Sequence, residues 1–247
     1  MAIFEYGEYQ GTYDPSDNLV EMFENSASRF ANNLLIGEKD GSGTYQWITY
    51  GQMATRINNL RAGLSSVGVK AGDTVGIIAG NRKEWLIGEI ATQGLGAAYV
   101  PMYEKELVAM WRYIIKDASV KVLLVSKKEV LEKVKDFPSE IPTLQHIFLI
   151  EGSGENSMEG LEKKGAQKPV PSIKPKPTDI AVLIYTSGTT GEPKGVLLSH
   201  GNLVENVKCA LSWFLNLTEK SRCISMLPWA HSFGITADLH GFILRGG

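Results

Sequence analysis

The sequence predicts an α/β protein in which a mostly parallel sheet is flanked by helices. Between residues 45 and 150, short runs of apolar and β-branched residues alternate with segments of helical spacing. The apolar runs are continuous, which is typical of strands that are buried on both faces. They occupy residues 74–79, 97–100, 120–125 and 147–150. Because helical segments separate them, we expect parallel strands in a doubly wound arrangement.

Three segments have the spacing of a capping box, in which an N-cap residue is followed three positions later by Glu or Gln. The pairs are Thr49 with Gln52, Asn81 with Glu84, and Ser126 with Glu129. An apolar pattern of helical spacing follows each pair, so we expect a helix to begin at each of them.

The chain divides into three regions by composition. Residues 1–150 form the first α/β half. Residues 151–178 contain glycines, five lysines and four prolines, and are expected to be a surface linker of extended conformation. Residues 179–247 resume with an apolar strand, a polar loop and further helices.

Composition excludes several classes of protein. The 247 residues carry 25 Lys and Arg against 27 Asp and Glu, a net charge of -2, so the chain has no basic field for nucleic acid. The start of the chain lacks the basic, then apolar, pattern of a signal peptide, and no apolar run approaches the ~18 residues of a membrane span. Cys209 and Cys223 have neither metal-ligand nor redox spacing. They are expected to be reduced core thiols in a cytoplasmic protein, for which peripheral membrane contact stays open.

The loop at residues 186–195 has the composition of an anion-binding site. It holds four hydroxyl side chains, three glycines and one lysine in ten positions, directly after the apolar strand. Gly188 and Gly191 allow backbone N–H groups to converge on a phosphate, and Lys194 supplies a positive charge. The loop is not a Walker A motif, because Lys194 follows proline and precedes glycine.

Three motifs resemble the adenylate-forming, AMP-binding superfamily, which includes acyl-CoA synthetases, aryl-CoA ligases, luciferases and peptide-synthetase adenylation domains. Residues 185–200 read YTSGTTGEPKGVLLSH and resemble its phosphate-binding signature. Residues 227–234 read LPWAHSFG and resemble the segment with the motif histidine. Residues 48–53 and 68–104, with Asn81, Glu84 and Trp85, resemble the long-chain fatty acyl-CoA synthetase branch.

The resemblance implies a fatty acid–CoA ligase that uses ATP, Mg²⁺ and CoA. A fatty acid would first form acyl-AMP and pyrophosphate, and the CoA thiol would then displace AMP. The residues implied to bind the β- and γ-phosphates are Thr186, Ser187, Gly188, Thr189, Thr190, Gly191 and Lys194. Thr189 is also implied to approach Mg²⁺, and His231 to lie beside the acyl carboxylate, so His231 and Lys194 are the expected catalytic residues.

Other motifs of the superfamily are missing from this sequence: the segment that holds adenine, the ribose-binding Asp, and the lysine of a C-terminal domain. We therefore expect the N-terminal portion of an acyl-CoA synthetase-like fold, inactive by itself. Two alternatives stay open: an adenylating ligase for an aryl or amino acid, and a nucleotide-binding module without chemistry. Acyl chain length and oligomeric state are left undetermined.

Overall fold

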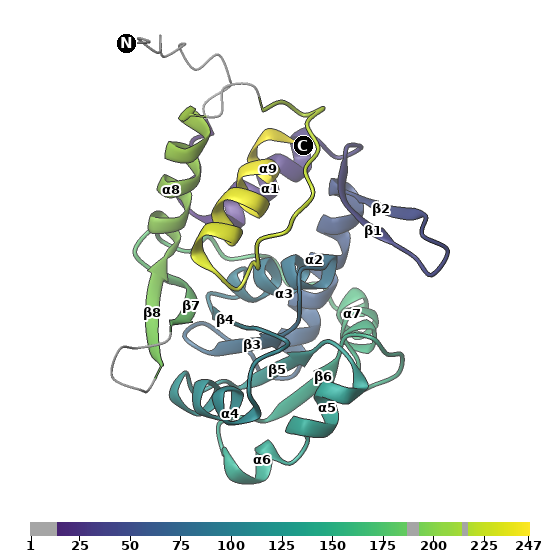
Figure 1. Ribbon diagram of the computed structural model, residues 1–247, viewed down its shortest axis with the longest axis vertical. Coiled ribbons are helices and arrows are strands. Elements are labelled where there is room, and N and C mark those ends of the chain that lie inside the picture. The colour runs from purple at the N-terminus through teal and green to yellow at the C-terminus, as the bar shows by residue number, and fades with distance from the viewer. Residues whose placement is uncertain (1–13, 187–192, 214–216) are drawn as a thin grey trace.

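A six-stranded sheet forms the centre of the computed structural model, which describes residues 14–186, 193–213 and 217–247 (Figure 1). The strand order is β6–β5–β3–β4–β7–β8. The strands are β3 (Thr74–Ile78), β4 (Ala98–Met102), β5 (Val122–Val125), β6 (His146–Leu149), β7 (Ile180–Thr186) and β8 (Lys194–Ser199). Neighbouring strands pair in parallel except β7 and β8, which are antiparallel. The mostly parallel sheet that the apolar runs predict is confirmed.

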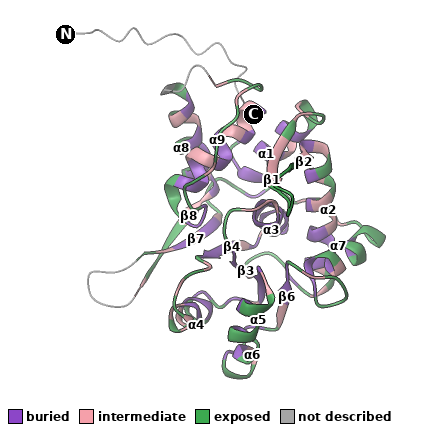
Figure 2. Cartoon of the chain, turned by 45° about the vertical axis from the view of Figure 1, so that its right-hand side comes forward, coloured by how far each residue is buried: buried purple, intermediate pink, exposed green. Residues whose placement is uncertain are grey.

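Helices cover both faces of this sheet. Val75 and Ile77 of β3 belong to a hydrophobic cluster with α2 (Tyr50–Ser66) and α3 (Lys83–Gln93). Ile78, on the opposite face, belongs to a second cluster with α4 (Val108–Asp117) and α5 (Lys128–Val134). Buried residues concentrate in α3 and the central strands, whereas the first four residues of β8 are exposed (Figure 2).

The remaining elements surround these layers. They are α1 (Leu19–Arg29), the antiparallel hairpin β1 (Leu34–Lys39) and β2 (Tyr45–Thr49), α6 (Phe137–Glu140), α7 (Met158–Gln167), α8 (His200–Trp213), the π-helix η1 (Gly234–His240) and α9 (Gly241–Arg245). Helices α1, α8 and α9 lie side by side at one end of the molecule (Figure 1).

Only the first predicted capping box is present. The Thr49 hydroxyl accepts the Gln52 N–H, and the Gln52 side chain accepts the Thr49 N–H. Helices do begin near the other two pairs, at Lys83 and Lys128, but the predicted caps are wrong. The Asn81 side chain is bonded to residues 225–229, and the Ser126 N–H donates to the Ile78 carbonyl and continues the strand ladder.

The region predicted to be an extended surface linker contains a packed helix. Helix α7 buries Met158, Leu161 and Gly165, and it lies against α2. The two helix backbones approach each other closely at two glycines. A Cβ at Gly165 would lie 1.9 Å from the Asn59 carbonyl oxygen, and a Cβ at Gly63 would lie 2.3 Å from the Leu161 carbonyl oxygen. Gly165, one of the glycines that indicate a loop in the sequence, therefore allows α7 to touch α2, and Gly63 does the same from α2.

Two further expectations concern membranes and cysteines. None of the helices in the described ranges is long and apolar enough to cross a membrane. The expectation of core cysteines is wrong, because Cys209 and Cys223 are free thiols on the surface. Cys223 lies in a segment whose apolar side chains are themselves exposed, among them Ile224 and Met226.

Candidate functional site

The predicted phosphate loop is carried by a hairpin at the edge of the sheet. Thr186, the last residue of β7, pairs directly across the ladder with Lys194, the first residue of β8, and both are exposed. Ser187, Gly188, Thr189, Thr190 and Gly191 lie outside the described residues. The structure therefore brings together the first and last of the predicted phosphate contacts, at the two ends of the loop.

One residue further back, the hairpin rests on an aromatic support. The Tyr185 hydroxyl donates to an Asp117 oxygen at 2.6 Å, and its ring meets the Tyr113 ring edge to face at 6.4 Å. Burial and the Asp117 carboxylate raise the pKa of Tyr185 above its ordinary value. A Cβ at Gly195, its cross-strand partner, would lie 3.1 Å from this ring, so glycine allows β8 to approach closely.

Lys194 has the surroundings of a residue that can bind an anion. No acidic side chain of residues 14–186, 193–213 or 217–247 forms an ion pair with it. It lies opposite the carboxyl end of β7, and ligands of open α/β sheets bind at the carboxyl ends of the strands. The loop after β3, which begins with Ala79 and Gly80, lies at the same edge, with β4 between it and β7.

His231 comes from a different part of the chain, in a tight turn that leads into η1. Its own N–H donates to the Pro228 carbonyl, and its carbonyl accepts the Ile235 N–H. The His231 side chain is exposed, and its Nδ1 accepts the Phe233 N–H at 3.2 Å. In the neutral ring this bond places the proton on Nε2, which then presents a donor to solvent.

Gly234 makes the turn around His231 this compact. A Cβ at Gly234 would lie 2.2 Å from the Pro228 carbonyl oxygen and 3.1 Å from that of Leu227. Trp229 then fastens the turn to the core. Its side chain is buried and meets the Trp85 ring edge to face at 5.7 Å.

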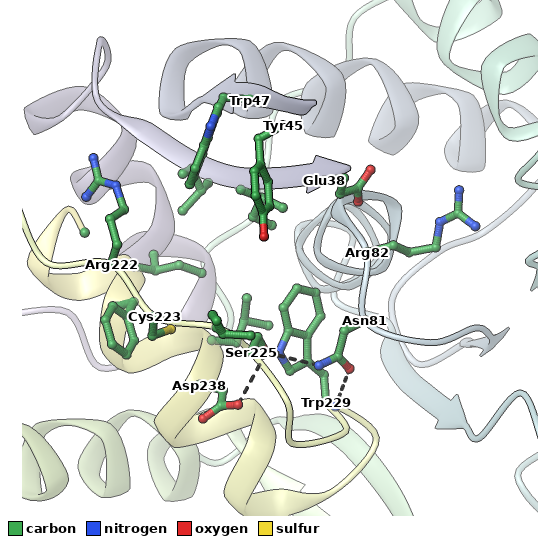
Figure 3. Close-up of a pocket in the computed structure, with 18 residues that line it drawn as sticks. Glu38, Tyr45, Trp47, Asn81, Arg82, Arg222, Cys223, Ser225, Trp229 and Asp238 are labelled. Atoms are coloured by element: carbon green, nitrogen blue, oxygen red, sulfur yellow. Dashed lines mark hydrogen bonds between the residues drawn. The ribbon is translucent and has the colours of Figure 1, made fainter. Parts of the chain in front are cut away.

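A cavity of about 430 Å³ lies on one side of this turn, between the β1–β2 hairpin, residues 222–229 and the helices η1 and α9 (Figure 3). Trp47, Trp229 and Phe242 contribute aromatic surface to it, and Asp238 and Arg82 contribute charge. Thr186, Lys194 and His231, the predicted site residues that the structure describes, do not line this cavity. The cavity is therefore separate from strands β7 and β8, the hairpin that carries the predicted phosphate loop and is called the phosphate hairpin below.

The described residues give only a partial view of the predicted metal site. Among them, no three His, Cys, Asp or Glu side chains are grouped in a way that could hold a metal ion. Thr189, the residue that the resemblance implies for Mg²⁺, lies in the range 187–192 that the structure does not describe.

The structure joins Thr186 to Lys194 but gives no direct contact between either of them and His231 within the described ranges. Sequence reasoning missed Gly234 and Asp238, which shape the turn of His231, and it misread Asn81 as a helix cap. For Asn81 a signal was present, since it belongs to one of the three motifs that carry the resemblance.

Comparison with known proteins assigns the chain to a family. Residues 23–247 match the family of AMP-binding enzymes, and the chain belongs to it. It is 32% identical to human long-chain-fatty-acid–CoA ligase 6, over 90% of this chain and 35% of that protein. It is 34% identical to the long-chain-fatty-acid–CoA ligase FadD15 of Mycobacterium bovis, over 98% of this chain and 40% of the other.

The same fold occurs in a solved structure. The long-chain-fatty-acid–CoA ligase FadD1 of Archaeoglobus fulgidus superposes with a TM-score of 0.80 at 23% identity, over 97% of this chain and 48% of that chain. The chain therefore spans less than half the length of each of these three proteins.

Proposed function

We propose that the gene product that carries this chain is an AMP-forming fatty acid–CoA ligase. The membership of the AMP-binding enzyme family supports adenylate formation. The identities of 32% and 34% to long-chain-fatty-acid–CoA ligases support a fatty acid as the substrate and CoA as the acceptor. Within the gene product, this chain would be the N-terminal portion of the AMP-binding domain, with residues 179–247 contributing the phosphate loop and its following helices.

The observation that carries the proposal is the pairing of Thr186 with Lys194 at the two ends of the loop. Lys194 and the loop residues Thr186, Ser187, Gly188, Thr189, Thr190 and Gly191 would bind the β- and γ-phosphates of ATP. The Lys194 ammonium group, without an acidic partner among the described residues and opposite the exposed Thr186, suits the charge-assisted hydrogen bonds that phosphate oxygens accept. His231 would lie beside the carboxylate of the acid and donate from Nε2.

The chemistry needs no protein nucleophile. A carboxylic acid with a pKa near ~4.3 is ionised at neutral pH. Its oxygen attacks the α-phosphorus of ATP, the bond to the β-phosphate breaks, and pyrophosphate leaves with the electron pair. The CoA sulfur then attacks the acyl carbon, AMP leaves, and the thiol proton passes to solvent. The protein contributes position, together with donors aimed at the charge that develops on pyrophosphate.

Mg²⁺ fits this site as a companion of ATP. It binds hard oxygen ligands and takes many of them from substrate phosphates and water, so the Thr189 hydroxyl would be its ligand from this chain. When bound, the ion would neutralise charge on the phosphate oxygens.

The exposed free thiols Cys209 and Cys223 suit a reducing compartment, and we place the reaction in the cytoplasm. Contact with a membrane surface stays a prediction.

The substrate class is tested by acid-dependent exchange of labelled pyrophosphate into ATP by the gene product. We expect exchange with long-chain fatty acids and little with benzoate, anthranilate or amino acids. Exchange confined to aryl or amino acids would instead support the alternative ligase, and ATP binding without any exchange would support a nucleotide-binding module. The isolated 247-residue chain is expected to show no exchange.

A further inference from the structure

Asn81 makes an unusual set of contacts for a residue in a loop after a parallel strand. Its Oδ1 accepts the backbone N–H of Trp229 at 2.9 Å. Its Nδ2 donates to the backbone carbonyl of Leu227 at 2.8 Å and to the Ser225 hydroxyl at 3.1 Å. One amide side chain thus binds an N–H and a C=O of a segment about 146 residues away. Figure 3 shows its bonds to Ser225 and Trp229. An amide side chain can donate from its nitrogen and accept at its oxygen at the same time at neutral pH.

Asp238 holds the same segment from the other side. Its Oδ2 accepts the backbone N–H of Leu227 at 3.1 Å. The same oxygen lies 3.4 Å from the Ser225 hydroxyl (Figure 3). Both backbone groups of Leu227 are therefore bound by side chains, one from the β3–α3 loop and one from η1. These bonds replace the strand ladder that an extended segment would otherwise have.

Trp229 links this arrangement to the histidine turn. Its indole Nε1 donates to the Ser225 hydroxyl at 2.9 Å, and its ring packs on Trp85. His231 is two residues further along, with its N–H on the Pro228 carbonyl. A shift of residues 227–229 would therefore move the His231 turn with it.

We infer that Asn81 and Asp238 are positioning residues that hold the His231 turn in register with the carboxyl edge of the sheet. The inference rests on the proposed function, in which His231 contacts the acid. Asn81 follows β3, whereas the predicted phosphate loop follows β7, and β4 alone separates these two strands. By binding residues 225–229, Asn81 ties the proposed acid contact to the same edge that carries the proposed phosphate contacts.

Amide hydrogen exchange of the gene product tests the contacts without any substrate. In Asn81→Ala, the Trp229 amide loses its acceptor, and its exchange is expected to become roughly tenfold faster or more. In Asn81→Asp, which keeps an acceptor oxygen, the Trp229 amide is expected to stay protected. In Asp238→Ala, the Leu227 amide is expected to exchange faster, and Asp238→Asn is expected to restore it. Asn58→Ala, on the exposed side of α2, is the matched control and is expected to change neither amide.

Kinetics of the gene product test the positioning role. Asn81→Ala is expected to raise the KM for the fatty acid, so that kcat/KM for the acid falls roughly tenfold relative to kcat/KM for ATP, while the KM for ATP stays within about twofold. A residue needed only for folding would reduce the amount of active enzyme and leave both KM values unchanged.

The inference would be overturned if the Trp229 amide exchanged at an unchanged rate in Asn81→Ala. It would also be overturned if kcat fell while the ratio of kcat/KM for the acid to kcat/KM for ATP stayed the same. If Asn81→Ala does not fold, the Asn81→Asp variant decides, because it must weaken use of the acid while Trp229 stays protected. Failure of the proposed function would be seen separately in Lys194→Ala. That variant would use ATP as well as the unaltered protein does, and its amide hydrogen exchange would be unaltered.

Discussion

At the scale of single residues, the candidate site depends on glycines at points where a side chain would be crowded or would clash. Gly195 admits the Tyr185 ring beneath the phosphate hairpin, and Gly234 admits the Pro228 carbonyl into the turn of His231. The sequence shows both as members of motifs with many small residues. It cannot show which glycine faces a backbone oxygen, because that depends on how the turn closes.

Gly234→Ala is expected to destabilise the protein. The added Cβ would lie 2.2 Å from the Pro228 carbonyl oxygen, so the turn must open to admit it. Overpacking of this kind costs about 1 to 3 kcal/mol, and urea unfolding monitored by tryptophan fluorescence would measure it. Gly41→Ala is the control, since nothing lies within 4 Å of its Cβ position. Equal stability of the two variants would show that the turn is looser than described.

At the scale of elements, buried polar contacts and close backbone approaches decide how helices meet. His200, at the start of α8, accepts the Leu19 N–H at the start of α1 through its Nδ1 at 3.2 Å, and its side chain is fully buried. Burial lowers the pKa of His200 to about 4 from its ordinary value of 6.5, with a smaller contribution from His240. The folded protein therefore holds this histidine neutral.

The low pKa of His200 predicts a loss of stability in acid. Well above pH 6.5 neither the folded nor the unfolded state protonates this histidine, and its contribution to stability is fully present. As the pH falls from 6.5 toward 4, the unfolded chain binds the proton and the folded one does not, so the free energy of unfolding falls by up to about 3 kcal/mol. His200→Asn keeps an acceptor near Nδ1 and cannot titrate. Urea unfolding across this range should show a shallower pH dependence in the variant, and an equal slope would contradict the assignment.

The contact between α2 and α7 predicts a second effect at this scale. Gly165→Ala would place a Cβ 1.9 Å from the Asn59 carbonyl oxygen, so the two helices must separate. We expect a destabilisation of about 2 kcal/mol or more. Ala166→Gly, one position along, is the comparison variant. It is expected to cost about 1 kcal/mol of stability through lower helix propensity alone. A thermal unfolding midpoint that falls no further for Gly165→Ala than for Ala166→Gly would contradict the close approach.

Local sequence rules succeeded for elements that are set by their own residues and failed where a distant segment decides. The central strands follow from continuous apolar runs, and the start of α2 follows from Thr49 and Gln52. Helix α7 was missed because its partner glycine lies on α2, about 100 residues earlier. Asn81 was misread as a cap because its real partners are residues 225–229.

At the scale of the whole molecule, one edge of the parallel sheet gathers the loops that carry the candidate chemistry. The predicted phosphate loop follows β7. The Asn81 loop follows β3 and holds the segment before His231. The motif at residues 185–200 indicated the first of these from sequence alone. The bond between Asn81 and the His231 segment could not be predicted, because side-chain hydrogen bonds to distant backbone leave no periodic pattern in a single sequence.

The central claim is that the loop between Thr186 and Lys194 binds the phosphates of ATP during adenylation. Its most direct test is fatty acid-dependent pyrophosphate exchange by the gene product with Lys194→Ala and, separately, Thr189→Val, against Lys163→Ala on the exposed side of α7 as a control. Removing a charged donor to a phosphate should raise the KM for ATP and reduce exchange by roughly 10² or more, whereas the control should match the unaltered protein. Undiminished exchange in Lys194→Ala and Thr189→Val would contradict the account.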